Sequence, residues 1–317
     1  MNIVVLDGYT VNPGDNPWDE LARVGNLRVF DRTPPERLLE RARDAEVLVT
    51  NKTPLRRDAL AQLDRLRGVS ILATGYDAVD VAYAKERGVW VSNVPAYSTA
   101  SVAQHTVALL LELCQHVGLH SASARAGDWS RAPDFCYWKE PLVELEGLTL
   151  GIVGFGAIGQ RVGATAAALG MKLATTPSRR GTARPDGVRT LPLEALLAES
   201  DVLTLHCPLT DETRRLVRRE TLARMKRSAL ILNTARGALV DETDLARALS
   251  DGAIGGAALD VLSVEPPPVD HPLLTAPRCL VTPHQAWTSL AARRRLVAVT
   301  AANVRGFQAG NPQNLVG

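Results

Sequence analysis

Cysteine is scarce in this chain, and the cysteines that it has are widely spaced. The 317 residues include four of them, Cys114, Cys136, Cys207 and Cys279. Disulfide frameworks and structural zinc sites need closely spaced ligands, and no CxxC pair occurs here. His116 and His120 would share one face of a helix, but no third ligand accompanies them. We therefore expect reduced thiols, as in the cytoplasm, and no metal site.

Long apolar runs and a surplus of one charge are missing as well. No stretch approaches the roughly 20 apolar residues of a membrane-spanning helix. The first seven residues have no basic start, and their apolar run is too short for a secretion signal. The formal net charge of +2 is too small to indicate nucleic acid or an anionic membrane as a partner. We expect a cytoplasmic protein that acts on a small molecule.

Short apolar runs alternate with helix-like segments along the whole chain, which is typical of parallel α/β sheets. A hydrophobic content of 46% over this length can bury a large core and indicates two domains. The predicted strands of the first part are 3–6, 27–30, 47–50, 70–73 and 89–92, with helices such as 35–43 and 79–87 between them. Those of the second part begin at 149 and continue near 172–176, 202–206, 229–233, 256–260 and 280–282.

Two further segments predict how the chain is divided. Residues 98–119 are unusually apolar and predict one long helix, buried on more than one face, which we interpret as an inter-domain helix and a dimer contact. Residues 290–307 predict a last helix that packs back on the first domain. The expected domains are 1–98 with 286–317, which would bind the substrate, and 99–285, which would bind a dinucleotide. Two crossings of the chain would let these domains close over a substrate.

A glycine fingerprint opens the second domain. Gly154, Gly156 and Gly159 follow a buried apolar run and precede an alanine-rich helical stretch, 160–169. The first glycine allows a tight turn, the second lets the backbone approach a pyrophosphate, and the third lets the helix pack on the strand. The amides of Ala157 and Ile158 would face the anion at the positive end of the helix. This context predicts a dinucleotide site.

The residues after the next predicted strand, 172–176, indicate which dinucleotide binds. NAD enzymes usually carry Asp or Glu there, to accept hydrogen bonds from the ribose 2′-hydroxyl. This chain has Ser178, Arg179 and Arg180 instead, and no acid before Asp186. Two charge-assisted hydrogen bonds of roughly 1.5–3 kcal/mol each would favour a 2′-phosphate by about a hundredfold or more. We predict NADP(H) in preference to NAD(H); a solvated basic loop is the alternative.

Three ionisable residues follow in the order Arg236, Glu265 and His284. Reduction of a 2-oxo acid by hydride transfer needs an acid that protonates the carbonyl oxygen, and a protonated imidazole can supply it. A carboxylate beside His284 would stabilise this charged form. A guanidinium can hold the substrate carboxylate and polarise the carbonyl group. Singly, each of the three is more often structural; together with the fingerprint they favour a redox enzyme.

Together, these motifs resemble those of the D-2-hydroxyacid dehydrogenase family, and within it the glycerate dehydrogenase and hydroxypyruvate (glyoxylate) reductase group. The segments that carry the resemblance are 151–159, 206–210, 233–237, 259–261 with 265–266, and 282–284, and also 7–10, 51–54, 73–76 and 134–138. The resemblance implies a Rossmann nucleotide domain inserted in a flavodoxin-like substrate domain. It also implies a homodimer.

The resemblance assigns roles to individual residues. His284 would be the acid/base, Glu265 its partner and Arg236 the substrate anchor, while Asp260 would orient the nicotinamide carboxamide. Other residues expected to line the cofactor pocket are Cys207, Pro208, Thr213, Thr234 and Ala235. Those expected to contact the substrate are Lys52, Thr74, Gly75 and, from a partner subunit, Trp138, which could equally be a plain interface aromatic. Gln104 and His105 depart from the family, since many relatives carry an acidic residue at this point.

The expected reaction is NADPH-dependent reduction of small 2-oxo acids, with hydroxypyruvate and glyoxylate as substrates. A reductase or dehydrogenase for bulkier acids such as phenylpyruvate is the first alternative. Formate oxidation is disfavoured because that branch of the family has Gln where this chain has Glu265. A nucleotide-sensing interaction protein, like the corepressors that share this fold, is an alternative of another class.

Overall fold

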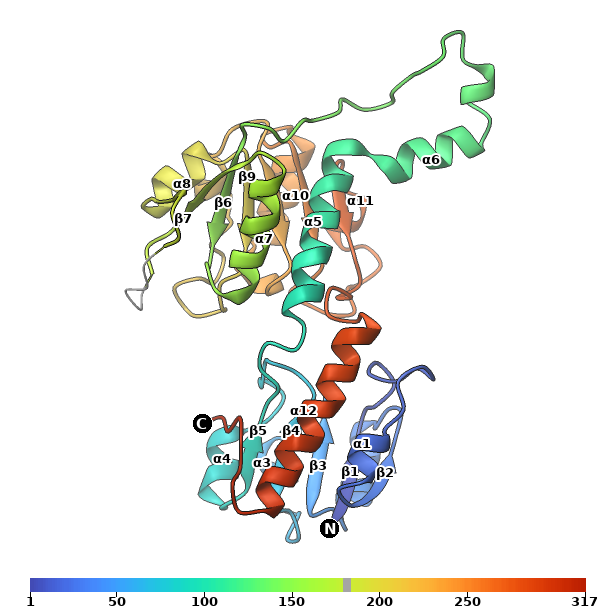
Figure 1. The fold of residues 1–317 in the computed structure, drawn as a ribbon, viewed down its shortest axis with the longest axis vertical. Coiled ribbons are helices and arrows are strands. Elements are labelled where there is room, and N and C mark those ends of the chain that lie inside the picture. Colours follow the sequence, from blue (N-terminus) through green and yellow to red (C-terminus); the bar gives the residue numbers. More distant parts are fainter. Residues whose placement is uncertain (179–183) are drawn as a thin grey trace. The chain divides into compact units, whose positions relative to one another are not determined.

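Two separate parallel sheets organise the chain (Figure 1). The computed structural model describes residues 1–178 and 184–317. These residues form two units. Unit 1 consists of Met1–Ser98 and Trp287–Gly317, and unit 2 of Thr99–Ala286. The chain therefore leaves unit 1 after Ser98 and returns to it at Trp287.

Unit 1 has a five-stranded sheet in the order β2-β1-β3-β4-β5, with every pairing parallel. Its strands are β1 (Asn2–Val5), β2 (Asn26–Val29), β3 (Val47–Thr50), β4 (Gly68–Ile71) and β5 (Trp90–Ser92). This is the order of flavodoxin-like sheets. All residues of β3 and β4 are buried, as expected for strands covered on both faces. The parallel α/β class predicted from the sequence is confirmed, although β4 begins two residues earlier than predicted.

Helices cover both faces of this sheet. They are α1 (Asp19–Ala22), η1 (Pro35–Arg37), α2 (Leu38–Ala42), α3 (Arg57–Leu60), α4 (Val81–Glu86) and α12 (Leu290–Gln308). The last helix begins at the N-cap Ser289, whose side chain accepts a hydrogen bond from the Ala292 amide. Its buried side chains Leu296 and Val304 belong to the same apolar cluster as Ile3 of β1. The predicted C-terminal helix and its packing on the first sheet are therefore confirmed.

Unit 2 has a seven-stranded sheet in the order β12-β11-β10-β9-β6-β7-β8, also parallel throughout. Its strands are β6 (Thr149–Val153), β7 (Lys172–Thr175), β8 (Val188–Thr190), β9 (Val202–Leu205), β10 (Leu230–Asn233), β11 (Gly256–Leu259) and β12 (Cys279–Val281). Starting from β6, the order is that of a Rossmann fold extended by one strand. The sequence predicted six of these strands and missed β8, a three-residue edge strand with mostly exposed side chains.

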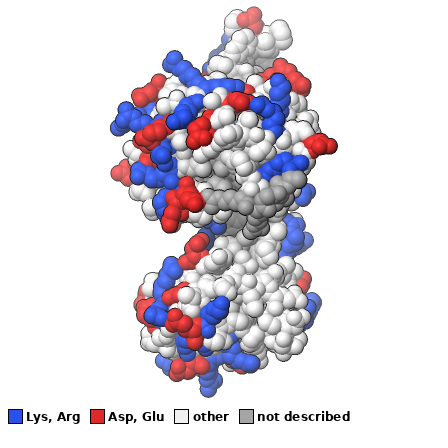
Figure 2. Space-filling model, turned by 90° about the vertical axis from the view of Figure 1, so that its left-hand side faces the viewer, with Lys and Arg blue, Asp and Glu red and all other residues white. Residues whose placement is uncertain are grey.

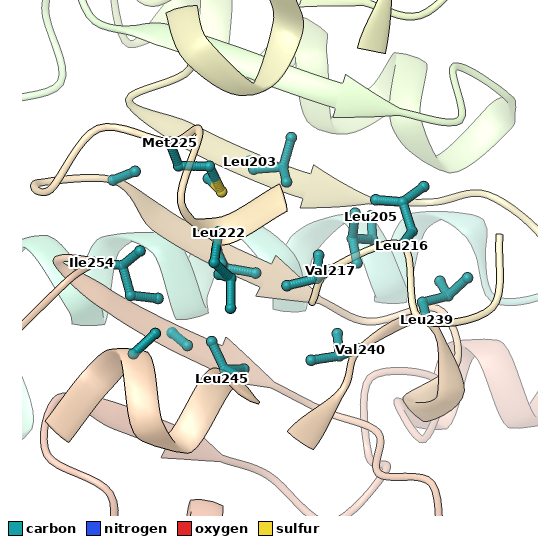
Figure 3. Close-up of a cluster of buried hydrophobic side chains, with 14 of the residues drawn as sticks. Leu203, Leu205, Leu216, Val217, Leu222, Met225, Leu239, Val240, Leu245 and Ile254 are labelled. Atoms are coloured by element: carbon teal, nitrogen blue, oxygen red, sulfur yellow. The ribbon is translucent and has the colours of Figure 1, made fainter. Parts of the chain in front are cut away.

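The helices of unit 2 pack on this sheet in two large apolar clusters, one of which is shown in Figure 3. They are α5 (Thr99–Gln115), α6 (Val117–Arg125), η2 (Trp129–Arg131), α7 (Ala157–Ala168), α8 (Leu193–Glu199), α9 (Arg219–Leu222), η3 (Gly237–Leu239), α10 (Glu242–Ser250) and α11 (Pro272–Thr275). Leu203 and Leu205 of β9 and Leu245 of α10 belong to the cluster shown in Figure 3. The cluster fixes the strand ends from which the site residues emerge.

The single helix predicted over 98–119 is wrong. The structure has two helices, α5 and α6, separated by His116, which adopts the left-handed conformation with φ 49° and ψ 40°. The left-handed residue ends the regular hydrogen-bond ladder of α5 and gives α6 a new direction. In Figure 1, α6 and the following segment extend away from the sheet of unit 2. We call residues 117–142 the arm.

Basic and acidic side chains are interspersed on the face shown in Figure 2. Such a surface agrees with the small net charge of the sequence. Among the described residues, none of the helices has the length and apolar character needed to cross a membrane.

Candidate active site

The three glycines of the fingerprint meet different surroundings. Gly154 has φ +96°, and a Cβ there would overlap the amide of Cys207. A Cβ on Gly159 would overlap the carbonyl oxygen of Gly154, so both positions require glycine for the fold itself. A Cβ on Gly156 would meet nothing within 4 Å in the described protein. The chain therefore leaves open the place that a pyrophosphate would occupy.

Helix α7 supplies the donors for such a group. Gly156 is its N-cap, and the helix runs for 12 residues from Ala157. The amides of Ala157 and Ile158 lie in the first turn, where N–H groups have no intrahelical acceptor. The first ladder bond after the cap is donated by the Gln160 amide to the Gly156 carbonyl oxygen, at 2.9 Å. Open space beside unpaired amides at the positive end of a helix fits a dinucleotide phosphate.

The predicted 2′-phosphate site lies partly outside the described residues. Ser178 belongs to the described segment that follows β7, whereas Arg179 and Arg180 do not. Arg184 returns to this region, where its Nη2 donates to the Thr176 carbonyl oxygen at 3.0 Å. Its guanidinium also lies 5.2 Å from the ring centre of Phe155, within the glycine fingerprint. A positive charge thus lies beside the glycine loop.

His284 and Glu265 are in direct contact. The distance from His284 Nδ1 to Glu265 Oε2 is 2.6 Å, and both side chains are about one-third exposed. A carboxylate only accepts, so Nδ1–H is the donor and Nε2 is left for a substrate. Glu265 is oriented in turn, because its Oε1 accepts from the Leu262 amide at 3.0 Å. His284 itself has φ +50°, an unusual conformation for a residue with a Cβ.

Arg236 follows β10, the strand that pairs with β11. It is the N-cap of η3, its side chain is exposed, and its Nη1 donates to the Ala235 carbonyl oxygen at 2.8 Å. Asn233 is fully buried and shapes this turn by donating to the Arg236 carbonyl oxygen at 2.9 Å. A Cβ on Gly237 would overlap the backbone of Leu262 and Ser263. The backbone beside Arg236 is therefore packed directly against the start of the segment that carries Glu265.

The three predicted catalytic residues thus follow three neighbouring strands, β10, β11 and β12, at one edge of the sheet. The carboxyl ends of parallel strands in doubly wound folds are where ligands bind. The topology and the His284–Glu265 contact place a base, a carboxylate and a guanidinium in one region of unit 2.

Asp260 is almost completely buried and holds the turn that carries His284. Its Oδ1 accepts from the Thr282 hydroxyl at 2.6 Å and from the Gln285 amide at 2.9 Å, and its Oδ2 accepts from the Ala286 amide at 2.8 Å. His105 Nε2 lies 3.0 Å from the Thr282 hydroxyl. Burial alone would raise the pKa of Asp260, but the hydrogen bonds from His105, Thr282 and the two amides outweigh it and lower the pKa. The nicotinamide contact of Asp260 stays a prediction.

The remaining residues predicted for the cofactor pocket lie at the ends of β9 and β10. Cys207 is buried, and burial raises the pKa of its thiol. The Thr213 hydroxyl closes a turn by donating to the Pro208 carbonyl oxygen at 2.7 Å. The Thr234 hydroxyl lies 2.9 Å from that of Thr106 in α5, and the Ala235 amide donates to Asn233 at 3.0 Å. These residues build the loops of the pocket, and their contacts with a cofactor stay predictions.

The predicted substrate residues of unit 1 lie on two adjacent loops after β3 and β4. The Asp7 carboxylate accepts from the amides of residues 51–53 at 2.5–2.7 Å, and the Lys52 side chain is exposed. The Asn51 side chain donates to the Leu72 carbonyl oxygen at 2.5 Å, which ties the two loops together. The amides of Thr74 and Gly75 make no hydrogen bond within the described parts of unit 1. Two unpaired amides and a lysine suit a carboxylate.

The contacts of His120 agree with the structural role predicted for it. The two ring nitrogens of His120 are used by backbone groups, since Nδ1 lies 2.8 Å from the His116 carbonyl oxygen and Nε2 accepts from the Lys139 amide. No cluster of potential metal ligands occurs in residues 1–178 and 184–317. Burial raises the pKa of Cys114 to about 11 and that of Cys279 to about 12, which keeps both thiols protonated.

Residues 107–286 match the family described as D-isomer specific 2-hydroxyacid dehydrogenase, NAD binding domain. This chain belongs to that family. It is 45% identical over 320 residues to a hydroxypyruvate reductase of Blautia hydrogenotrophica, covering 100% of this chain and 99% of the relative. A glycerate dehydrogenase of Methylorubrum extorquens is 43% identical over 284 residues, covering 89% and 88% of the two chains. The crystal structure of the TT0316 protein from Thermus thermophilus has 36% identity and a TM-score of 0.88, with 100% of both chains covered.

The chain is therefore an NAD(P)-dependent oxidoreductase, a D-2-hydroxyacid dehydrogenase by family. In this dehydrogenase, the sequence analysis missed the residues that shape the site without reaching into it. Asn233 was part of a recognised motif and is a buried polar residue at a strand end, but no role was assigned to it. Glu242 and His271, whose side chains lie 3.0 Å apart beside the segment that carries Glu265, lie outside every recognised motif, and nothing in their spacing connected them with Glu265.

Proposed function

We propose that this dehydrogenase reduces small 2-oxo acids, hydroxypyruvate and glyoxylate, to D-2-hydroxy acids with NADPH. The observation that carries the proposal is the 2.6 Å contact between His284 and Glu265 at the strand edge that also bears Arg236. The relatives named hydroxypyruvate reductase and glycerate dehydrogenase support the substrate class.

In this proposal, the glycine loop and the first turn of α7 would hold the dinucleotide, whose nicotinamide would supply a hydride to the carbonyl carbon of the substrate. His284 Nε2 donates its proton to the carbonyl oxygen as negative charge develops there. Glu265 stabilises the charged imidazole before the transfer and keeps the ring oriented. Arg236 holds the substrate carboxylate and polarises the carbonyl group. In unit 1, the unpaired amides of Thr74 and Gly75 would suit a carboxylate. In the oxidation direction, neutral His284 accepts the proton.

The preference for NADPH rests on the sequence Ser178, Arg179 and Arg180 and is supported by the position of Arg184. A basic segment without an acid favours a ribose 2′-phosphate and lacks the usual acceptor for a 2′-hydroxyl.

Initial rates with NADPH and NADH, each with hydroxypyruvate, glyoxylate and phenylpyruvate, test the proposal. We expect NADPH with the two small acids to give the highest kcat/KM. Arg179→Ala/Arg180→Ala should raise the KM for NADPH by about a hundredfold and leave that for NADH nearly unchanged. The matched control is Arg189→Ala, which removes an exposed arginine that pairs with Glu199. Equal use of both nucleotides by the unmodified enzyme would contradict the cofactor assignment, and activity on phenylpyruvate alone would contradict the substrate.

The proposal includes a homodimer whose second copy covers the arm. Val117, Trp129, Phe135 and Trp138 of the arm are 62%, 57%, 89% and 68% exposed. With their neighbours they line a largely apolar pocket of about 450 Å³. Exposed apolar surface of this kind marks interaction sites. Trp138 would reach the active site of the second copy.

Phe135→Asp should convert the dimer to a monomer, as measured by light scattering after size exclusion. Leu39→Asp, which places a charge on a partly exposed leucine of unit 1, is the control and should leave the mass unchanged. Trp138→Ala should raise the KM for the oxo acid if the side chain reaches the partner's site. A monomeric wild-type enzyme with full activity would contradict both roles.

The proposed compartment is the cytoplasm. All four cysteines are free, and Cys136 is exposed on the arm. An exposed free thiol suits a reducing compartment.

A further inference from the structure

The segment that carries Glu265 has little burial of its own. From Ser263 to Asp270 all residues are exposed except Pro267, and Val264 and Val269 are 61% and 96% exposed. A segment with so few buried contacts has low local stability unless something else fixes it. Glu265 must nevertheless stay within hydrogen-bond distance of His284. We call residues 263–271 the Glu265 segment.

One carboxylate holds both ends of this segment. Glu242 is the first residue of α10, and its side chain is only 14% exposed. Its Oε1 accepts from the Ser263 amide at 2.6 Å, and its Oε2 lies 3.0 Å from His271 Nε2. A carboxylate accepting a backbone N–H at this distance forms a strong, charge-assisted hydrogen bond. The exposed middle of the segment therefore spans two points fixed by the same side chain.

The buried ring of His271 completes the attachment. The Leu273 amide donates to its Nδ1 at 3.3 Å, where His271 is the N-cap of α11. Nδ1 is thus the acceptor, and the neutral ring carries its proton on Nε2, which donates to Glu242. His271 therefore joins the start of α11 to the start of α10 through a single tautomer.

We propose that Glu242 and His271 are positioning residues, which hold the Glu265 segment so that Glu265 stays against His284. Neither of them touches the reacting atoms. Other charged or titratable groups in this region are Arg236 after β10, Asp260 after β11 and His105 of α5, whose Nε2 lies 3.4 Å from Asp260 Oδ1. The inference rests on the proposed function, in which protonated His284 is the acid of the reduction.

The pH profile of reduction reports the position of Glu265. Reduction requires protonated His284, so kcat falls as the pH rises and the proton is lost. Withdrawal of Glu265 removes the carboxylate that stabilises the charged ring, so this decline moves to lower pH. Glu242→Ala should move the midpoint of the decline to lower pH and lower kcat by about tenfold. The KM for NADPH should change little.

Two companion variants separate this role from a general loss of stability. His271→Asn keeps an N-cap for α11, because Asn caps helices well, but its shorter side chain cannot reach Glu242. It should shift the profile in the same direction as Glu242→Ala. Asp244→Asn is the matched control, since Asp244 lies in the same helix turn but accepts from the Arg219 amide, outside the Glu265 segment. Its profile should coincide with that of the wild type.

Glu265→Gln provides the reference shift and distinguishes two kinds of failure. A shifted profile in Glu265→Gln with an unshifted one in folded Glu242→Ala and His271→Asn overturns the positioning role alone. If Glu242→Ala and His271→Asn lower the thermal stability without shifting the profile, the positioning role is also overturned. An unshifted profile in Glu265→Gln overturns the acid role of His284 and, with it, the proposed function. If Glu242→Ala does not fold, the shift in His271→Asn decides.

Discussion

At the scale of single residues, the fingerprint separates glycines that the fold needs from one that it does not. Gly154 combines a positive φ with a close approach to Cys207, whereas Gly156 faces open space. No described residue therefore requires glycine at position 156, whereas a bound pyrophosphate would impose it.

Gly156→Ala should leave the melting temperature of the free enzyme nearly unchanged but raise the Kd for NADPH by about tenfold or more, which corresponds to about 1.4 kcal/mol. Gly154→Ala should destabilise the free enzyme by about 1–3 kcal/mol, since it adds strain at a positive φ. Thermal unfolding with and without NADPH measures both effects. A Gly156→Ala enzyme that melts as early as Gly154→Ala would contradict this distinction.

His206, at the end of β9, makes stability depend on pH. Burial lowers the pKa of its imidazole to about 4, below the value of 6.5 for an exposed histidine. Below pH 6.5 the unfolded chain takes up a proton that the folded chain does not, so stability present above that pH is lost as the pH falls toward 4. Because the residue is partly exposed, we expect a loss of about 1–3 kcal/mol.

His206→Gln should reduce this loss. Melting temperatures measured from pH 7.5 to pH 4.5 should fall less steeply for the variant than for the wild type. Parallel curves would show that His206 is not responsible.

The grouping of the candidate catalytic residues at one edge of the sheet could be predicted because their types and order are distinctive. Arg236, Glu265 and His284 each follow a predicted strand, and the topology brings neighbouring strand ends together. The positioning residues could not be found in this way. Glu242 and His271 act through contacts between the start of α10 and a distant loop, and those contacts exist only once the sheet and α10 have packed.

At the scale of elements, strands were predicted well and helix ends less well. Buried parallel strands are continuous apolar runs, so β3, β9 and β10 stand out by composition alone. The edge strand β8 has no such signal. The break between α5 and α6 was missed because its cause is a left-handed residue that is not glycine, and such a conformation leaves no mark in an apolar pattern.

The break at His116 allows a test of its backbone conformation. The His116 side chain makes no cap hydrogen bond to α6, and left-handed geometry disfavours any residue with a Cβ. His116→Gly should therefore stabilise the protein by about 0.5–1 kcal/mol, seen as a higher melting temperature or denaturant midpoint. The control Ala122→Gly, at an exposed position inside α6, should destabilise it by about 1 kcal/mol. Equal destabilisation by both variants would contradict the role of this conformation.

At the scale of the whole molecule, the predicted functions are divided between the units. The glycine fingerprint and the three predicted catalytic residues belong to unit 2, whereas the predicted substrate residues Lys52, Thr74 and Gly75 belong to unit 1. The division follows from the chain path, since unit 2 is one continuous stretch within unit 1. We therefore expect the cofactor to affect unit 2, and the substrate carboxylate to affect unit 1 as well.

Hydrogen exchange can follow the two units separately. NADPH alone should slow amide exchange at residues 157 and 158 and in the loop after β9, because these amides would face the dinucleotide. The further addition of oxalate, an unreactive dianion of the size of a small oxo acid, should slow exchange at Thr74 and Gly75, whose amides are unpaired in the described structure. The amides of residues 51–53 are the internal control, because Asp7 already accepts from them. Protection at Thr74 and Gly75 by NADPH without oxalate would mean that their amides respond to the cofactor and would remove the argument that they bind the substrate carboxylate.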